Sequence, residues 1–352
     1  MSAQLEVVAP GALATIQDLG RFGWRRSGVP WAGALNPAQL RIANALAGNA
    51  QGAPAIEFFV TSPTLRAVDA PVRLAFAGDF PVELVRDGQK ITVESWRSLT
   101  LAPGESVRAG PVASGRVGYI AVTGLTVPTV LGSAATYARA GLGGVEGRVL
   151  ASGMRLVAQA QEPGTQEAIL RQPPREEPGP IRVVLGPQDG YFTEEAIADF
   201  LSCAFQVSPQ ADRMGIRLEG PTLRHRADKG AEIISDATVP GAIQVPGNGQ
   251  PIVLLADAQT AGGYPKIATV ASADLPRLAV ASVGAMIRFH AITVAEAEAL
   301  ARQREEALQH LLQQIVPMTL VDGVDLEAIY QGNLVSGVVD ALAPEHIFGA
   351  LD

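Results

Sequence analysis

The side chains best suited to chemistry lie in one glycine-rich, strand-forming segment, residues 241–270. Glycine lets a backbone turn sharply or approach a ligand, and the β-branched runs beside it predict strands that fix polar groups in place. Amide, phenol and ammonium groups suit an amide, a carboxylate or a carbonyl oxygen better than they suit a metal ion. We therefore predict a pocket in which Gln244 and Gln250 bind substrate and Tyr264 and Lys266 are the catalytic residues.

Lys266 follows the sequence Gly-Gly-Tyr-Pro, a rigid turn that restricts the stem of the lysine. Partial burial among the neighbouring apolar strands would suit this amine to proton transfer or to binding a carboxylate. The alternative is an exposed lysine on a turn. Tyr264 likewise either donates to a carbonyl oxygen or seals the turn.

A second charged segment, residues 212–220, alternates apolar and polar side chains as a strand does. The apolar side chains at 214, 216 and 218 fall on one face. On the other, we expect Asp212 and Arg213 to fix each other, which leaves Arg217 to meet an anionic group. Asp212 and Arg217 are therefore candidate substrate-binding residues, and a surface ion-pair ladder of little energetic value is the alternative.

A third polar cluster stands near the N-terminus, where Gln17, Asp18 and Arg21 occur within five positions. One interpretation is a group that faces a cavity and binds substrate. The other is a turn in which Asp18 accepts backbone N–H bonds and pairs with Arg21. Both interpretations stay open from the sequence.

The composition describes an acidic globular protein of 352 residues, long enough for two cores. Its formal charge of -8 argues against a nucleic-acid partner, because phosphate binding needs a basic face. The single cysteine excludes an intrachain disulfide, and the four histidines lack metal-ligand spacing, so no metal site is predicted. We see neither a signal peptide nor a membrane span and expect a cytoplasmic location.

Proline-rich, charged sequence near the middle of the chain predicts a linker between two β-rich domains. We expect an N-terminal domain over residues 1–165, a linker over 166–180, a C-terminal domain over 181–295, and a helix with an extension over 296–352. Short strand-like runs broken by Gly, Asp or Pro recur in both halves. The predicted fold class is mainly β with some α.

Local signals place turns and helix ends. The Asp-Gly pair at residues 87–88 predicts a two-residue hairpin turn, and Pro-Gly-Glu-Ser at 103–106 predicts a turn in the next hairpin. Three helices are expected: two with N-caps at Asn36 and Thr193, and a longer one from about Thr293 to Ile315.

Four separated motifs, in the right order, resemble one known family: residues 14–49, 127–150, 208–221 and 241–270. It is the family of allophanate hydrolase subunit 2, or KipA-like proteins. That family includes the C subunit of the ATP-hydrolysing 5-oxoprolinase complex and one half of the biotin-dependent carboxyltransferase domain of urea carboxylase. The resemblance implies a cyclophilin-like β-barrel in each half, and we expect the second barrel to enclose a small guest molecule.

The resemblance implies that the chain is the C subunit of an ATP-dependent 5-oxoprolinase complex. The complex cleaves the cyclic amide 5-oxoproline to glutamate, together with a KipI-like protein and a LamB/YcsF-like protein as its other subunits. No GxxxxGK[ST] string occurs, so we expect ATP to be used by the complex and no cofactor to be bound by this chain. Two alternatives are a carboxyltransferase that moves a carboxyl group from carboxybiotin to urea or a related amide, and a non-enzymatic KipA-like regulatory binding protein.

The sequence departs from the family pattern at two positions. Asn36 stands where relatives usually carry aspartate, and we interpret it as a helix cap, a role that both residues fill. Ala134 stands where many relatives place an arginine, so a five-donor fork suited to a carboxylate or phosphate is lost there. Whether either departure changes activity stays open.

Overall fold

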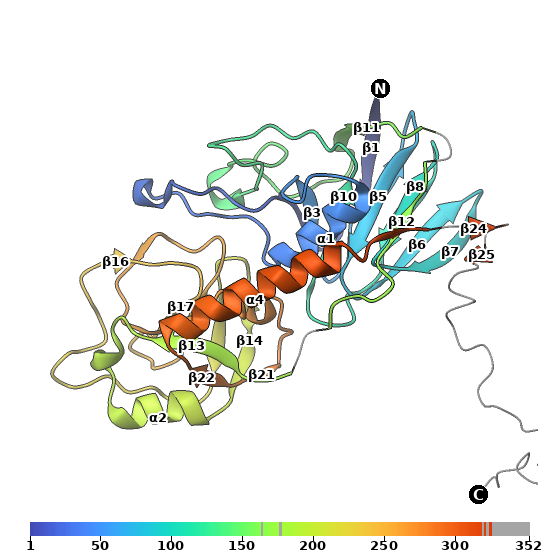
Figure 1. Ribbon diagram of the computed structural model, residues 1–352. Helices are drawn as coiled ribbons and strands as arrows, with labels where there is room; N and C mark the ends of the chain where they lie inside the picture. The colour runs from blue at the N-terminus through green and yellow to red at the C-terminus, as the bar shows by residue number, and fades with distance from the viewer. Residues whose placement is uncertain (163–164, 176–177, 319, 322–323, 326–352) are drawn as a thin grey trace, which may run out of the picture.

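The computed structural model describes residues 1–162, 165–175, 178–318, 320–321 and 324–325 of the chain. Within them the fold is mainly β with four α-helices, which confirms the predicted fold class. Two sheets formed by the N-terminal part of the chain lie beside one larger sheet formed by the C-terminal part (Figure 1). We call them the N-terminal sheets and the C-terminal sheet.

The N-terminal sheets have six and five strands, in the orders β11-β1-β4-β9-β6-β7 and β2-β3-β10-β5-β8. The first comprises β1 (Ser2–Ala9), β4 (Thr64–Ala67), β6 (Pro81–Arg86), β7 (Gln89–Glu94), β9 (Ser106–Ala109) and β11 (Arg155–Gln159). The second comprises β2 (Leu13–Gln17), β3 (Ala55–Phe59), β5 (Val72–Ala77), β8 (Ser98–Leu101) and β10 (Val117–Val122). Residues of both sheets, among them Leu5, Phe58 and Phe76, are fully buried in one apolar cluster.

The turn between β6 and β7 confirms the first hairpin signal. Arg86 pairs with Gln89, and between them Asp87 and Gly88 have φ values of 50° and 75°. Two positive φ angles define the type I′ turn that matches the twist of paired strands. The predicted second hairpin is wrong: residues 103–106 do form a turn, but β8 pairs with β5 whereas β9 pairs with β4 and β6. That turn therefore carries the chain from one sheet to the other.

The C-terminal sheet has eight strands in the order β21-β14-β15-β18-β17-β20-β13-β22 and curves into a nearly closed, barrel-like shape. Its strands are β13 (Ile181–Leu185), β14 (Phe205–Ala211), β15 (Gly215–Glu219), β17 (Ala242–Gln244), β18 (Ile252–Leu254), β20 (Lys266–Val270), β21 (Met286–Ile287) and β22 (Phe289–Ala291). All pairings in it are antiparallel except that of β13 with β22.

One face of the C-terminal sheet is filled by its own apolar side chains. Ile216, Ile243 and Val253 are fully buried there, with Phe200 and Phe289 stacked in the same cluster. The expectation that this sheet encloses a guest molecule on its core side is therefore wrong, because packed side chains occupy that space.

The helices begin where their capping residues predict. Asn36 caps α1 (Pro37–Ala47) by accepting a hydrogen bond from the backbone N–H of Gln39. Thr193 caps α2 (Glu194–Ser202), and Thr293 forms a capping box at the start of α4 (Val294–Leu312). A short helix, α3 (Leu275–Ala279), was not expected.

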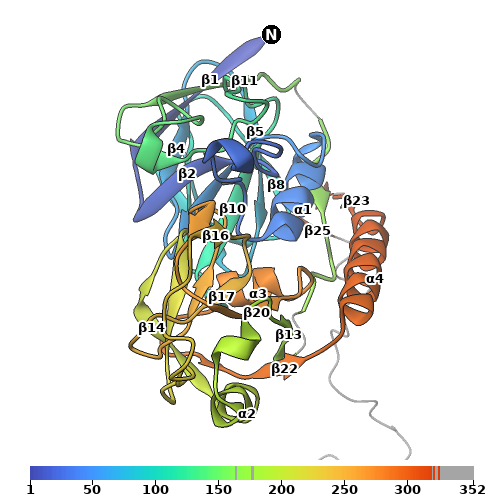
Figure 2. The same cartoon turned by 90° about the vertical axis from the view of Figure 1, so that its left-hand side faces the viewer.

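Helix α4 returns from the C-terminal sheet and lies alongside α1 of the N-terminal part, as Figure 2 shows. A bidentate pair between Arg41 and Glu305 joins the two helices, with N···O distances of 2.6 and 2.7 Å. Beyond α4, β23 (Val316–Pro317) pairs with β12 (Ala168–Ile169), which lies in the segment expected to be a linker.

Three 3₁₀ helices, η1 (Arg25–Ser27), η2 (Ala138–Ala140) and η3 (Asp189–Tyr191), and two short strand pairs complete the fold: β16 (Asp236–Ala237) with β19 (Ala261–Gly262), and β24 (Leu320–Val321) with β25 (Val324–Asp325). The expected C-terminal extension beyond residue 325 lies outside the described residues. Among the helices that are described, none is both long and apolar enough to cross a membrane.

Candidate functional site

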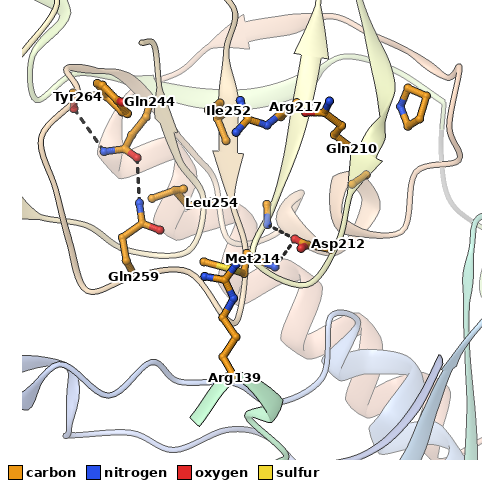
Figure 3. Close-up of a pocket in the computed structure, with 13 residues that line it drawn as sticks. Arg139, Gln210, Asp212, Met214, Arg217, Gln244, Ile252, Leu254, Gln259 and Tyr264 are labelled. Atoms are coloured by element: carbon orange, nitrogen blue, oxygen red, sulfur yellow. Dashed lines mark hydrogen bonds between the residues drawn. The ribbon is translucent and has the colours of Figure 1, made fainter. Parts of the chain in front are cut away.

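A cleft of about 500 Å³ opens on the C-terminal sheet, on the face opposite its apolar core (Figure 3). Most of its walls come from β14, β15, β17, β18 and the loops that follow them, and one residue comes from η2 of the N-terminal part. The lining residues are Arg139, Pro209, Gln210, Ala211, Asp212, Met214, Gly215, Arg217, Gln244, Ile252, Leu254, Gln259 and Tyr264.

Strand alternation decides which side chains reach the cleft. On β15, Ile216 and Leu218 are buried in the core while Arg217 between them is exposed on the cleft face. On β18, Val253 joins the core and its neighbours Ile252 and Leu254 form an apolar floor to the cleft. The sheet thus offers a ligand an apolar surface with polar groups around it.

Two glutamine side chains form the polar centre of the cleft. Nε2 of Gln259 donates to Oε1 of Gln244 over 3.1 Å, and Nε2 of Gln244 donates to the main-chain oxygen of Tyr264 over 3.4 Å. A Cβ added at Gly262 would lie 2.4 Å from Nε2 of Gln244, so only glycine leaves room for this amide. Gln244 is buried and fixed, whereas Gln259 is exposed and its side-chain oxygen, Oε1, has no partner among the described residues.

Tyr264 stands at the rim of the cleft and is 40% exposed. It lies in the loop before β20, and its main-chain oxygen is the acceptor that orients Gln244. Tyr264 therefore borders the cleft beside the two glutamines.

The charged lining consists of Arg139, Arg217 and Asp212. Oδ1 of Asp212 accepts hydrogen bonds from the backbone N–H groups of Met214 (2.8 Å) and Gly215 (3.2 Å), which closes the turn between β14 and β15. Two arginines against one aspartate leave a formal charge of +1 in a chain whose total is -8.

The expected pairing of Asp212 with Arg213 is wrong. Arg213 is buried and donates to both carboxylate oxygens of Asp257 over 3.1 and 2.9 Å, to the main-chain oxygen of Gly33 over 2.6 Å, and to Glu57. Glu57 belongs to β3 of the N-terminal sheets, so this arginine joins the two parts of the molecule. Arg213 therefore does not line the cleft, although both of its neighbours in the sequence do.

Glu57 extends the buried network further. Its carboxylate accepts hydrogen bonds from the Tyr119 hydroxyl (2.6 Å) and from the Leu35 backbone N–H (2.8 Å). Burial, together with the negative charge of Glu57, raises the pKa of Tyr119 well above its ordinary value. Burial opposes the charge of Arg213, but Glu57 and Asp257 outweigh it and raise the pKa of that guanidinium. No local sequence signal links these residues, because they come from separate strands and loops.

Lys266 lies away from the cleft. Its side chain is only 3% exposed, and Nζ donates to Oδ2 of Asp236 over 2.8 Å and to the main-chain oxygen of Ala237 over 3.1 Å. The structure therefore shows neither the exposed turn lysine nor a lysine beside Tyr264 in the cleft. In this position the amine holds β16 against the start of β20.

Gln250 is also outside the cleft lining. Its amide makes two reciprocal bonds with Gly220: the N–H of Gly220 donates to Oε1 over 3.0 Å, and Nε2 donates to the Gly220 oxygen over 3.2 Å. These bonds join the loops beyond the paired strands β15 and β18.

Gln17, Asp18 and Arg21 form the buried turn, the second of the two interpretations, although Asp18 does not bond Arg21. Asp18 accepts from the Gly20 and Ala134 N–H groups and from the Ser133 hydroxyl. Arg21 donates to the main-chain oxygens of Val130 and Ala135, and Gln17 donates to that of Thr136 and accepts from the Gly33 N–H. Together they hold the segment 130–136 against the N-terminal sheets.

The structure thus brings four predicted residues together at the cleft: Asp212, Arg217, Gln244 and Tyr264. It adds two that were not predicted as site residues, Gln259 and Arg139. Gln259 belongs to the polar segment that marked the site, whereas nothing in the sequence separated Arg139 from an ordinary surface arginine. Arg25 of η1 supports the rim by donating to the main-chain oxygens of Thr238 (2.6 Å) and Gln259 (3.0 Å).

The family described as "Carboxyltransferase domain, subdomain A and B" matches residues 27–291, and the chain therefore belongs to this family. The resemblance drawn from the four sequence motifs is confirmed.

Particular relatives narrow the comparison. The chain is 38% identical over 299 residues to the 5-oxoprolinase C subunit of Escherichia coli (strain K12), covering 83% of this chain and 93% of that protein. It is 36% identical over 312 residues to the 5-oxoprolinase C subunit of Haemophilus influenzae (strain ATCC 51907 / DSM 11121 / KW20 / Rd), covering 87% and 97%. The structure of the Kluyveromyces lactis urea carboxylase aligns with a TM-score of 0.78 at 26% identity, over 91% of this chain and 30% of that larger chain.

Proposed function

We propose that this chain is the C subunit of an ATP-dependent 5-oxoprolinase assembly and that its cleft holds the cyclic amide during cleavage to glutamate. The names of two relatives that align over most of their length support the assembly. The observation that supports the cleft as the site is the pair of glutamine amides, Gln244 and Gln259, on an apolar floor with an exposed phenol beside them.

The groups in the cleft complement a ring amide. Such a ring presents one N–H donor and one carbonyl acceptor, and a glutamine side chain offers both an acceptor and donors. Gln244 is fixed by Tyr264 and Gly262, so Gln259 can bond the ligand while its own orientation is set by Gln244. The apolar floor at Ile252 and Leu254 accommodates the CH₂ groups of the ring.

Cleavage breaks the ring C–N bond, adds the oxygen of water to the carbonyl carbon and delivers a proton to the nitrogen. Of the two residues first assigned to catalysis, Tyr264 borders the cleft and Lys266 does not. In our proposal the Tyr264 hydroxyl donates to the carbonyl oxygen as negative charge develops there. Lys266 keeps the neighbouring strands in place.

The remaining chemistry belongs to the assembly in this proposal. A KipI-like protein and a LamB/YcsF-like protein complete it, and ATP is used there. The test is reconstitution: this chain is mixed with those two proteins from the same genome, and glutamate formed from 5-oxoproline is measured with and without ATP.

We expect ATP-dependent glutamate only when all three proteins are present, and a Tyr264→Phe variant should lower the rate about 10²-fold or more because one donor to the oxyanion is lost. Glutamate formation no faster than in the mixture lacking this chain would contradict the proposal.

A second candidate function has its own support: the structural match to a urea carboxylase and the name of the family. In that case the cleft presents urea or a related amide to carboxybiotin on a partner protein. Transfer of labelled carboxyl from a carboxybiotinylated protein to urea, dependent on this chain, would favour it over 5-oxoproline cleavage.

A further inference from the structure

We infer that Arg139 and Arg217 form one anion-binding subsite across the cleft, which holds the carboxylate of the ligand. This inference rests on the proposed function, because it specifies which cyclic amides the same cleft accepts. It requires the ligand to carry an anionic group beside its ring amide.

Both guanidinium groups are unpaired in the part of the chain that the structure describes. Among the described residues, neither Arg139 nor Arg217 has a hydrogen bond or ion pair from its side chain. By contrast, the structural arginines Arg21, Arg116 and Arg213 each donate to several main-chain or carboxylate oxygens. Arginine is the side chain whose planar fork matches a carboxylate, so two unused forks at one cleft indicate an anionic ligand.

The cleft lining is locally positive. The lining has two arginines and one aspartate, a formal charge of +1, although the whole chain carries -8. Asp212 offsets one of the two positive charges, but it forms no ion pair with either arginine among the described residues, and its Oδ1 accepts from the N–H groups of Met214 and Gly215. A concave site of positive charge in an acidic protein raises the local concentration of anions.

The two arginines come from separate parts of the chain. Arg217 extends from β15 of the C-terminal sheet, whereas Arg139 extends from η2 and ends beside Met214, as Figure 3 shows. A carboxylate bonded by both would link the N-terminal and C-terminal parts through the ligand. The amide pair Gln244–Gln259 lies in the same cleft and is left for the ring amide.

The test is isothermal titration calorimetry on the full chain with the KipI-like protein present. The probes are 5-oxoproline, its neutral analogue 2-pyrrolidone, and inorganic phosphate as a second source of anionic oxygen. The variants are Arg139→Gln, Arg217→Gln and the double variant, with Arg224→Gln as a matched control on an exposed arginine outside the cleft. Thermal denaturation checks that each variant is folded.

We expect 5-oxoproline to bind about 10- to 100-fold more weakly to each single variant, since one charge-assisted bond is lost. Binding of 2-pyrrolidone should be unchanged in all variants and weaker than that of 5-oxoproline to the original chain. The double variant should lose less than the product of the two single losses, because both arginines bind one group.

Three other outcomes have separate meanings. If 5-oxoproline and 2-pyrrolidone bind equally tightly and the substitutions change neither, the subsite is wrong while the proposed function stands. If only phosphate binds and each substitution weakens it, the anion subsite stands and the proposed function fails. If none of the three probes binds to the original chain, both are overturned.

Discussion

Two arginines four positions apart, Arg213 and Arg217, end in opposite settings. Arg213 is buried where the N-terminal sheets meet the C-terminal sheet, and its guanidinium is bonded to Glu57 and Asp257. Arg217 is exposed in the cleft and bonds no other described residue. A structural arginine differs from one available to a ligand in whether its guanidinium N–H groups are already bonded within the protein.

The cluster of Gln17, Asp18 and Arg21 belongs with Arg213 by the same criterion. Asp18 bonds two backbone N–H groups and the Ser133 hydroxyl, so its carboxylate is occupied by the protein itself. These three residues match the cleft residues in type but are bonded mainly to main-chain groups of the protein itself. Their function is to fix a loop.

The largest effect in the comparison of Arg213 with Arg217 is expected for Arg213→Met. This substitution removes the cation and leaves Glu57 and Asp257 without it where the N-terminal sheets meet the C-terminal sheet. We expect a loss of about 3–5 kcal/mol in the free energy of unfolding, because a buried charge left without its partner is strongly destabilising. Urea denaturation followed by circular dichroism measures it. Arg217→Met is the control and should change stability by no more than about 0.5 kcal/mol; equal losses in both variants would refute the distinction.

A second test acts on the cleft alone. In Gly262→Ala, the new Cβ would lie 2.4 Å from Nε2 of Gln244 and force that amide to move. We expect binding of 5-oxoproline to weaken about tenfold, or about 1.4 kcal/mol, with little change in unfolding. Gly263→Ala is a matched control, since the nearest atom to its Cβ is the Ile233 oxygen at 3.5 Å. Unaltered affinity in Gly262→Ala would show that Gln244 does not position the ligand.

The smallest effect is expected at Glu305. This residue is intermediate between the buried Arg213 and the exposed Arg217, because it is paired with Arg41 yet half exposed. Hydrogen bonds from Arg41 and Gln309 lower the pKa of Glu305 to about 2. A lowered carboxyl pKa means that the stabilisation is complete above about pH 4.5 and is lost as the pH falls to about 2. Solvent screening limits it to less than about 0.5 kcal/mol.

The stability of the Glu305→Gln variant should therefore fall less than that of the original chain between about pH 4.5 and 2. Thermal unfolding at each pH measures this difference. Glu306→Gln, one position along the same helix, should keep the pH profile of the original chain. A profile unchanged in Glu305→Gln would show that the pair holds α4 too weakly to matter.

Much of the fold follows from local sequence. The caps at Asn36, Thr193 and Thr293 each place a side-chain acceptor where the first free N–H groups of a helix need one. The pair at 87–88 supplies the positive φ angles of a two-residue turn. The turn at 103–106 was misassigned to a hairpin because a turn signal does not say which strand pairs with which; long-range pairing decides that.

The candidate site was predicted in part, and the failures have physical causes. Arg217 lies on β15, where its alternation with apolar residues gave its direction correctly. The rigid turn before Lys266 does not direct this lysine into the cleft, because β20 begins at Lys266 and its amine bonds Asp236, whereas Tyr264 lies in the loop before the strand. Arg139 reaches the cleft from a distant part of the chain, a contact that spacing within a segment does not reveal.

Arg25 contacts the main chain of Thr238 and Gln259, so the rim of the cleft is completed only after the C-terminal part has been synthesised. Both Arg25 and Arg139 emerge from the ribosome well before the strands against which they are placed, so a nascent chain that stops after the N-terminal sheets has no complete binding cleft. Once the C-terminal sheet has folded, an occupant touching both walls resists their separation by mass action. Adding the ligand should then protect the N-terminal and C-terminal parts from a protease at the same ligand concentration.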